Sequence, residues 1–222
     1  MSRSLLFSAE PRLPDRLVER LASHEVSILS DAMSRMNGLV GILPINPGAP
    51  RRLAGRALTV RVAPGDNIGL YKAFDVVEPG DVIVIDAGGH VDRAIFGEIL
   101  VRYAMSIGVG GIVIDGAVRD ITALQSLAIP IFARGISHLG PFKNGPAEVR
   151  GVISVGSCPI LNGDIIIGDA DGVVRIPSGD AEAVADTADT IVSAEAAAMR
   201  DIERGTYDPK AISSAVATIE HE

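Results

Sequence analysis

The sequence predicts a mixed α/β fold, and two observations lead to this class. Three phrases of one type each place a Gly turn before an apolar strand that ends in Asp; they are residues 80–86, 111–115 and 163–169. Between the first two phrases, residues 97–107 repeat apolar side chains at helical spacing. Strands separated by a helix indicate a layered domain, and the unequal intervals between the phrases argue against a solenoid.

The composition provides enough apolar material for a hydrophobic core. Hydrophobic residues make up 47% of the 222 residues and charged residues 22%, which excludes a wholly disordered chain. A chain of this length forms one large domain or two small ones.

Nucleic acid is not an expected partner of this chain. The formal net charge is -8 and no Lys/Arg cluster is longer than Arg51-Arg52, whereas a nucleic-acid-binding face is basic. Trp is absent and aromatic residues make up only 4%, which leaves few side chains for stacking on bases.

We also expect a cytoplasmic protein with no membrane attachment. No apolar run approaches the roughly 20 residues that a membrane span needs. The N-terminal segment lacks the apolar stretch of a signal peptide. The single cysteine, Cys158, cannot form an intrachain disulfide, which fits a reducing compartment.

Two helices are expected near the N-terminus, after a loose arm over residues 1–13. Pro14 suits the first turn of a helix, because its missing N–H has no intrahelical partner there. A second short helix is expected over residues 27–36. The first helix has an apolar stripe formed by Leu17, Val18 and Leu21.

A connecting loop and a half-buried strand come next. Residues 39–54 contain several prolines and predict a loop, and residues 55–62 alternate apolar and polar side chains as a strand does. Asp66 and Asn67 then precede a helix over residues 68–74. Either side chain can face an active site, but a helix cap explains both, and we prefer the cap.

The stretch from Gly97 to Thr122 organises the rest of the chain. Its helix has an apolar side formed by Ile99, Leu100, Tyr103 and Ile107. The helix is expected to end at the glycines Gly108, Gly110 and Gly111, because glycine readily takes positive φ angles. The run Ile112-Val113-Ile114 indicates a strand covered on both faces. Antiparallel packing of this helix and strand would return Arg119 and Asp120 to the neighbourhood of Glu98.

Two interpretations of this cluster of three charged residues remain open from the residues alone. The first is a surface salt bridge with a helix-capping acid, which is common and contributes little to stability. The second is a divalent-metal site for an anionic substrate. In it Asp120 binds the metal, Glu98 holds metal-bound waters, and Arg119 grips a carboxylate with two N–H groups.

Other candidate groups have simpler explanations. An Asp at a strand end, as at Asp86, Asp115 and Asp169, is usually a turn or cap residue. The backbone after the first phrase, at Gly88-Gly89-His90, could cradle an anion. No two of the four histidines have the spacing of zinc ligands, so no zinc site is expected.

A nucleophile is not expected in the loop over residues 135–145. Ser137 and His138 are adjacent, but no G-x-S-x-G elbow surrounds the serine. Lys143 could form a Schiff base with a carbonyl substrate, but we prefer the interpretation that it is a solvated lysine in a Pro/Gly loop.

The C-terminal third predicts two further strands, a long helix and a tail. The strands are expected at residues 129–133 and 148–155, the helix at 180–204 and the tail at 206–222. An acidic start and Gly205 at the end support the helix bounds. Ala-rich helices can pack on another subunit, so Glu195 and Glu203 are candidate contributors to a neighbour's site.

Five segments give the chain a resemblance to the RraA-like superfamily and, within it, to the 4-hydroxy-4-methyl-2-oxoglutarate aldolases. The metal motif of that family is an acid, twenty residues, then Arg-Asp, and this chain has Glu98, twenty residues, then Arg119-Asp120. Many aldolases also carry an acid where this chain has Ala123. The matching segments are residues 63–67 (APGDN), 80–89 (GDVIVIDAGG), 97–100 (GEIL), 110–120 (GGIVIDGAVRD) and 168–177 (GDADGVVRIP).

The resemblance implies a fold and an assembly. We expect a single RraA-like domain over residues 1–222, of the α/β class, with a swivelling β/β/α-type layered core at about 13–178 and additional N- and C-terminal helices. A homotrimer or a dimer of trimers is the assembly that the family implies.

The resemblance also implies a chemistry. It is a lyase, dependent on Mg²⁺ or Mn²⁺, acting on short 2-oxo dicarboxylates by retro-aldol cleavage or by oxaloacetate decarboxylation. Arg119, Glu98 and Asp120 would be catalytic, and Gly97, Ile99 and Leu100 would bind substrate with Arg119, through backbone N–H groups at the helix start. The alternative is a non-catalytic regulator that binds a protein such as a ribonuclease; such regulators typically lack the Asp after the Arg.

Overall fold

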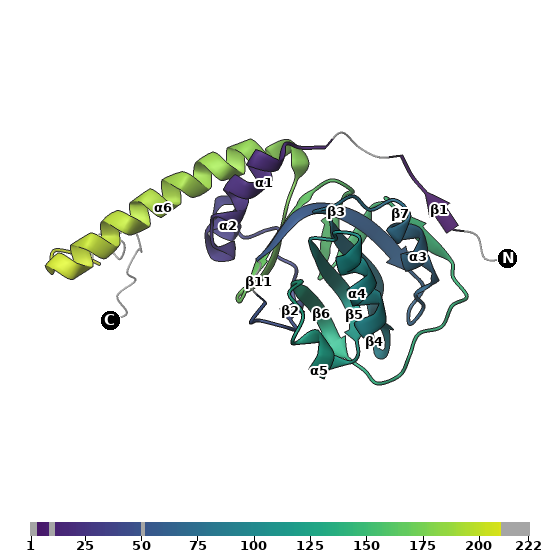
Figure 1. The fold of residues 1–222 in the computed structure, drawn as a ribbon. Coiled ribbons are helices and arrows are strands. Elements are labelled where there is room, and N and C mark those ends of the chain that lie inside the picture. The colour runs from purple at the N-terminus through teal and green to yellow at the C-terminus, as the bar shows by residue number, and fades with distance from the viewer. Residues whose placement is uncertain (1–3, 9–11, 50–51, 210–222) are drawn as a thin grey trace, which may run out of the picture.

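The computed structural model describes residues 4–8, 12–49 and 52–209, and it has the expected mixed α/β fold (Figure 1). The helices are α1 (Asp15–Ala22), α2 (Val26–Ala32), α3 (Ile68–Phe74), α4 (Glu98–Ser106), α5 (Ile121–Leu124) and α6 (Ala181–Arg204). The strands are β1 (Ser4–Leu6), β2 (Leu43–Pro44), β3 (Leu53–Val62), β4 (Val82–Phe96), β5 (Gly111–Val118), β6 (Ile131–Ile136), β7 (Ala147–Val149), β8 (Ile153–Val155), β9 (Cys158–Ile160), β10 (Ile165–Asp169) and β11 (Gly172–Ile176).

Four parallel strands form the centre of the main sheet. Its order is β1-β7-β3-β4-β5-β6-β2, with β3, β4, β5 and β6 parallel to one another. The first half of β3 pairs instead with β10, antiparallel, and β10 pairs with β11. The long strand β3 therefore connects the main sheet to a second β layer.

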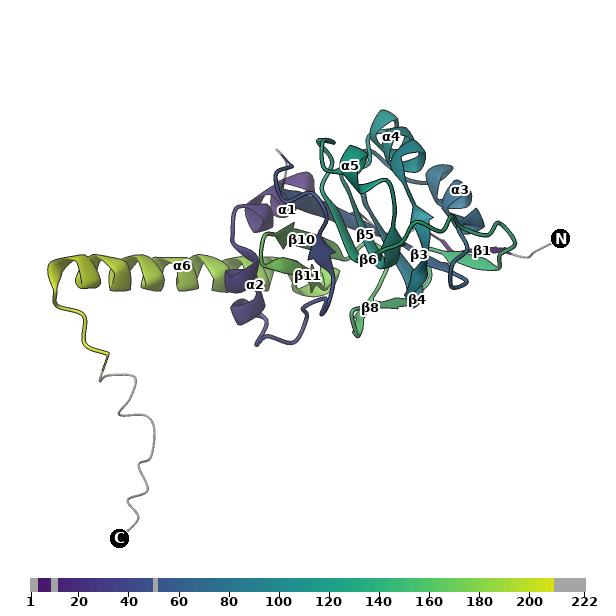
Figure 2. The same cartoon turned by 90° about the horizontal axis from the view of Figure 1, so that it is seen from below.

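Three apolar clusters separate four layers. The first lies between the main sheet and helices α3, α4 and α5, with Phe74, Val101 and Leu124 among its members. The second lies between the main sheet and the β8–β9 and β10–β11 hairpins, and the third between β10–β11 and helices α1, α2 and α6. The swivelling β/β/α-type core with added terminal helices is therefore confirmed (Figure 2).

The connections of the parallel strands gather several loops at one edge. Each of β3, β4 and β5 is followed by a helix on the same face of the sheet, so the carboxyl ends of all three open at the same edge. Ligands of open α/β sheets bind at this edge, because the loops there carry side chains without having to pair in the sheet.

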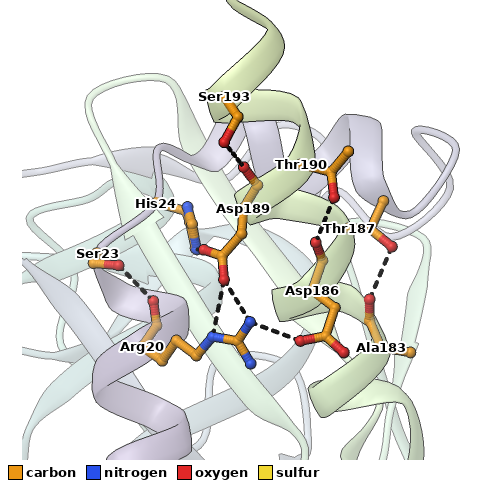
Figure 3. A network of polar contacts seen from close by, with 9 residues as sticks. All are labelled: Arg20, Ser23, His24, Ala183, Asp186, Thr187, Asp189, Thr190 and Ser193. Carbon is orange, nitrogen blue, oxygen red and sulfur yellow. Dashed lines mark hydrogen bonds and ion pairs between the residues drawn. The ribbon is translucent and has the colours of Figure 1, made fainter. Parts of the chain in front are cut away.

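Helix α6 is joined to α1 by a charged contact as well as by apolar packing (Figure 3). Arg20 donates to both Asp186, at 2.7 Å, and Asp189. His24 Nε2 lies 2.9 Å from the other oxygen of Asp189, close enough for an ion pair but not aligned as a hydrogen bond. These contacts are all made by the first part of α6; its C-terminal half extends away from the domain (Figures 1 and 2).

Several element predictions need correction. Part of the expected arm, Ser4–Leu6, forms a strand parallel to β7, and residues 1–3 and 9–11 lie outside the described residues. The expected strand at 148–155 is two strands, β7 and β8, in different layers. The first two Gly-strand-Asp phrases form the central strands β4 and β5, whereas the third forms β10, which lies in the second layer.

The glycine cluster after α4 has two different causes. Gly108 has φ +84° and ends the helix as expected. Gly110 and Gly111 do not have positive φ; a Cβ on Gly110 would lie 2.7 Å from the carbonyl oxygen of Gly80, and one on Gly111 would lie 2.1 Å from Leu53. Close approach of the Gly80 backbone and of the Leu53 side chain, not backbone conformation, therefore accounts for the last two.

The long C-terminal helix was predicted at 180–204 and is found at Ala181–Arg204, with Gly205 at φ +71° after its end. The expected tail at 206–222 is described only as far as residue 209. Within the described ranges, no helix combines the length and the apolar character that crossing a membrane requires.

Candidate active site

A cavity of about 310 Å³ opens at the carboxyl edge of the central strands. Its volume is at the lower end of the roughly 300–1,000 Å³ range of ligand pockets, which suits a small molecule. Its lining comes from the last residues of β4 and from the segments after β3, β4, β5 and β6. The residues are Asn67, Tyr71, Ile95, Phe96, Gly97, Ile99, Leu100, Arg119, Asp120, Gly140, Pro141 and Lys143.

Asp120 is held at the start of α4 by the backbone of that helix. Its Oδ2 atom accepts the N–H of Glu98 at 3.0 Å. Asp120 also stands at the N-cap position of α5 with φ +62°, a left-handed conformation that Asp tolerates better than most residues. The predicted return of Asp120 to the neighbourhood of Glu98 is therefore confirmed as a position in space.

Gly97 leaves the room that this contact requires. A Cβ atom at this position would lie 2.5 Å from Asp120 Oδ2 and 3.0 Å from Arg119 Cγ. Its backbone is extended, with φ −151°, which any residue adopts. Glycine is needed here because the Arg119-Asp120 pair packs against it, and no conformational strain is involved.

Arg119 lies beside Asp120 with its guanidinium in the cavity lining. Its N–H donates to the carbonyl of Phe96 at 3.0 Å, which joins the ends of β4 and β5. Its Nε atom is 3.6 Å from Asp120 Oδ2, and its side chain is 40% exposed. This loose pairing leaves the guanidinium N–H groups accessible to an anion in the cavity.

The start of α4 presents backbone N–H groups to the same cavity. The first N–H groups of a helix have no partner within it. Here the N–H of Glu98 donates to Asp120 and that of Val101 donates to the carbonyl of Gly97. The N–H groups of Ile99 and Leu100, two residues of the lining, are therefore available to a ligand. Ile99 is 80% exposed, so its predicted place on the buried side of α4 is wrong; Val101 and Ala104 occupy that side.

Glu98 reaches this site through its backbone and turns its side chain elsewhere. Its Oε1 atom accepts from Arg102 Nε at 2.7 Å, an i,i+4 pair on the surface of α4, and Glu98 is not part of the lining. Its predicted function of holding metal-bound waters stays a prediction, and it requires the carboxylate to leave Arg102.

Two residues of the cavity, Asn67 and Lys143, were assigned other functions from sequence. A helix cap was preferred for both Asp66 and Asn67. Asp66 does cap α3, since its Oδ1 accepts the N–H of Ile68 at 2.8 Å, but the Asn67 amide donates instead to the carbonyl of Ile95 inside the pocket. Lys143 is exposed, as expected, yet its Nζ donates to Asn67 at 3.2 Å and to Tyr71 at 2.9 Å. No local pattern marks either residue, because the loop that carries Lys143 returns to α3 only in the folded chain.

The donor chemistry of the lining fits a hard divalent cation with few protein ligands. Within the described residues no three His, Cys, Asp or Glu side chains are grouped as a metal cage. Mg²⁺ does not need one, because it is usually held by one or two carboxylates and keeps several waters. The carboxylate of Asp120 is 42% exposed and belongs to the lining, so it meets this requirement.

The remaining candidates are occupied in structural contacts. Asp115 pairs with Arg134, Asp169 with Arg52, and Asp86 with Arg61 at 3.3 Å. Ser137 donates to the carbonyl of Asp92 at 2.6 Å, outside the cavity. Glu195 and Glu203 lie on the exposed half of α6 and do not line this cavity in their own chain, nor does Ala123.

Comparisons with known proteins agree with this fold. A model of the RraA-like family, described as Aldolase/RraA, matches residues 26–175. A relative in Halalkalibacterium halodurans, provisionally assigned as a 4-hydroxy-4-methyl-2-oxoglutarate aldolase, is 45% identical over 157 residues, which cover 70% of this chain and 74% of the relative. The 4-hydroxy-4-methyl-2-oxoglutarate aldolase of Thermus thermophilus is 33% identical over 130 residues, or 59% of this chain and 79% of that enzyme.

A solved structure gives the same fold. The crystal structure of Streptomyces coelicolor RraAS2, described as an unusual member of the RNase ES inhibitor RraA protein family, has a TM-score of 0.76 against this chain, with 26% sequence identity. The match covers 84% of this chain and 96% of that one. From the family model and these relatives together, the chain belongs to the RraA-like (Aldolase/RraA) family.

Proposed function

We propose that this protein is a divalent-metal-dependent lyase that cleaves short 2-oxo dicarboxylates. The reactions are retro-aldol cleavage of 4-hydroxy-4-methyl-2-oxoglutarate and decarboxylation of oxaloacetate. The names of two relatives support the first reaction. The observation that carries the proposal is Asp120, fixed by the N–H of Glu98 and beside Arg119, in the lining of a small cavity.

The two reactions share the charge that a site of this kind stabilises. In the retro-aldol reaction the 4-hydroxyl loses its proton and the C3–C4 bond breaks. In the decarboxylation the bond to CO₂ breaks. Both leave an electron pair that spreads onto the 2-oxo oxygen as the enolate of pyruvate, which then takes a proton at carbon. Groups that stabilise this oxygen therefore accelerate both reactions.

The residues of the cavity divide the work of binding and charge stabilisation. The guanidinium of Arg119 pairs with the substrate carboxylate or with the developing enolate oxygen through its planar set of N–H donors. The N–H groups of Ile99 and Leu100, at the positive end of α4, bind the carboxylate. Gly97 keeps Asp120 and Arg119 in place by lacking a side chain.

Asp120 would hold Mg²⁺ or Mn²⁺ directly, and Glu98 would hold it through water. Such an ion, when bound, supplies Lewis-acid polarisation of the 2-oxo group. One carboxylate suits Mg²⁺, which is usually held by one or two carboxylates and keeps several waters.

Pyruvate release with and without metal tests this proposal. The full chain is treated with EDTA, freed of the chelate, and assayed with 4-hydroxy-4-methyl-2-oxoglutarate and with oxaloacetate. We expect no pyruvate above the uncatalysed rate until Mg²⁺ or Mn²⁺ is added back. Full activity in a sample verified as metal-free would contradict the metal-dependent mechanism.

A second function has one observation in its favour, the structural similarity to RraAS2. In that case the chain would be a non-catalytic regulator that binds a protein such as a ribonuclease. The presence of Asp120 after Arg119 favours the lyase. Absence of pyruvate from a panel of 2-oxo acids, with either metal present, would leave the regulator as the better explanation.

A further inference from the structure

The cavity contains a second cation, Lys143, that the proposed chemistry does not use. Its ammonium donates to Asn67 Oδ1 at 3.2 Å and to the hydroxyl of Tyr71 at 2.9 Å, and it lies 4.7 Å from the centre of the Tyr71 ring. Asn67 is itself 2% exposed and anchored to the carbonyl of Ile95. Lys143 therefore has a defined place in the lining, unlike a lysine that points freely into solvent.

The backbone on both sides of Lys143 is also fixed. Phe142 exchanges hydrogen bonds with the α3 entry: its N–H donates to Gly65 and its carbonyl accepts from Asn67. The buried carboxylate of Asp66 accepts the N–H groups of Asn144 and Gly145. These contacts hold the loop before and after Lys143, so the ammonium is positioned before any ligand arrives, which lowers the entropic cost of binding.

The charge of Lys143 has no acidic partner within residues 4–8, 12–49 and 52–209. Both acceptors of its ammonium are neutral, whereas Lys72, on the same side of the fold, pairs with Asp75 at 3.1 Å. An ammonium has three N–H donors, and two are used here. The third donor and the whole positive charge are available to an anion in the cavity.

We propose that Lys143 is a specificity residue that binds the second carboxylate of a 2-oxo dicarboxylate. This inference rests on the proposed function. Arg119 and the N–H groups of α4 come from the β4 and β5 ends of the cavity, and Lys143 with its supports from α3 and the loop after β6. A ligand whose 2-oxo acid end occupies the first group has its other end in the same small cavity as the Lys143 ammonium, which is available to bind it.

Two substrate analogues that differ in one carboxylate test this assignment by binding alone. These are 2-oxoglutarate and 2-oxopentanoate; neither carries a 4-hydroxyl, so neither can undergo retro-aldol cleavage. Calorimetry on the full chain with Mg²⁺ should show tighter binding of 2-oxoglutarate. Lys143→Met should weaken 2-oxoglutarate about tenfold, the scale of one charge-assisted hydrogen bond at an exposed site, and leave 2-oxopentanoate within about twofold.

Two further variants separate charge from structure. Lys72→Met removes the same charge from α3 outside the lining and should change neither affinity. Lys143→Gln keeps a donor for Asn67 and Tyr71 but loses the charge, so it should behave as Lys143→Met does. If only the Met variant lost selectivity, the lysine would be a structural support for the loop and the assignment would be wrong.

Cleavage assays distinguish failure of this inference from failure of the proposed function. The matched substrates are 4-hydroxy-4-methyl-2-oxoglutarate and 4-hydroxy-4-methyl-2-oxopentanoate, and we expect Lys143→Met to lower kcat/KM for the dicarboxylate alone, mostly through KM. A wild-type chain that binds and cleaves neither would overturn the proposed function, and this assignment with it. An active wild type whose Lys143 variants lose both substrates equally, or neither, would overturn only the assignment to Lys143.

Discussion

At the scale of single residues, the site depends on two neighbours with unlike requirements. Asp120 has a left-handed backbone, with φ +62°, and its carboxylate accepts the N–H of Glu98. Arg119 needs an anchored main chain and a free guanidinium, and it has the bond to Phe96 and a 3.6 Å contact to Asp120. Substitutions at this pair can therefore separate charge from geometry.

Asp120→Asn should remove activity without unfolding the protein. Asn also tolerates the left-handed conformation, and its carbonyl can still accept the N–H of Glu98, but the negative charge that holds a cation is lost. We expect pyruvate release to fall at least about a thousandfold, because a Lewis acid supplies several kcal/mol and each ~1.4 kcal/mol is tenfold. The thermal unfolding midpoint should stay near that of the wild type; a large drop would instead support a purely structural salt bridge.

Arg119→Lys should be a poor replacement. Lysine retains the positive charge but not the planar set of donors that matches a carboxylate. We expect kcat/KM for the 2-oxo acid to fall at least about tenfold, the free-energy scale of one charge-assisted hydrogen bond. A near-normal value would show that Arg119 serves only as a counter-ion for Asp120.

Gly97→Ala should disturb the site with little change in stability. Because φ is −151°, alanine fits the backbone, yet its Cβ would lie 2.5 Å from Asp120 Oδ2, so the pair must move. A displacement on the order of 1 Å can cost about a hundredfold in rate. Steady-state kinetics should show this loss while the unfolding transition is preserved; Gly179→Ala, which meets no neighbour within 4 Å, is the control.

At the scale of elements, the contact between α1 and α6 adds charge to apolar packing. The hydrogen bond from Arg20 to Asp189 lowers the pKa of that carboxyl below its usual range. A lowered pKa means that the ionised form is the one stabilised in the folded state. The resulting stability is present above the ordinary Asp pKa of about 4 and is lost as the pH falls through the lowered value.

Arg20→Ala should therefore be destabilising in a pH-dependent way. We expect the difference in free energy of unfolding between wild type and variant to be largest near neutral pH and to shrink as Asp189 becomes protonated at low pH. Urea unfolding at a series of pH values measures it. Arg200→Ala removes the same charge from the exposed half of α6 and serves as the control. A difference that stayed constant with pH would contradict the Arg20–Asp189 explanation.

At the scale of the whole molecule, α6 is divided into two halves with different surroundings. Its first half is buried against its own domain through Val184, Ala185 and Ala188. The C-terminal half of the helix extends from the domain (Figure 1). This half exposes apolar side chains, with Met199 at 63% and Ile202 at 53%. This half supports the prediction of an oligomer without testing it.

Truncation after Ile191 tests the assembly more sharply than removal of the whole helix. The shortened chain keeps the buried half of α6, so its fold and thermal transition should persist. We expect light scattering to show a smaller particle than the full chain, and pyruvate release to fall because Glu195 and Glu203 are removed from any neighbouring site. A full-length chain that is an active monomer at assay concentration would contradict this prediction, and leave the metal chemistry intact.

The extent of prediction from sequence differed between elements for physical reasons. Residues 97–107 were readable as a helix because their apolar side chains recur at helical spacing, although Ile99 of that set is exposed. Residues 112–114 were readable as a buried strand because a β-branched run is typical of a strand covered on both faces. The break between β7 and β8 was not readable, because the alternation of apolar and polar residues over 148–155 looks the same whether one strand continues or the chain changes layer. The strand at Ser4–Leu6 depends on its partner β7, which lies more than a hundred residues further along the chain.

The same distinction applies to the candidate site. Glu98, Arg119 and Asp120 are linked by a helix and a strand that are contiguous in sequence, so local geometry was enough to bring them together, and the family resemblance depended on the same residues. Asn67 and Lys143 meet through a hydrogen bond that spans 76 positions of the chain. The Glu98 carboxylate points away from the cavity because it pairs with Arg102 at i,i+4. The sequence alone determined the α/β class, the family motif and the Arg119-Asp120 pair, since these depend on local periodicity and spacing. Only the tertiary structure decided what surrounds that pair, because the remaining lining is brought in by strand order and loop return, which no local pattern encodes.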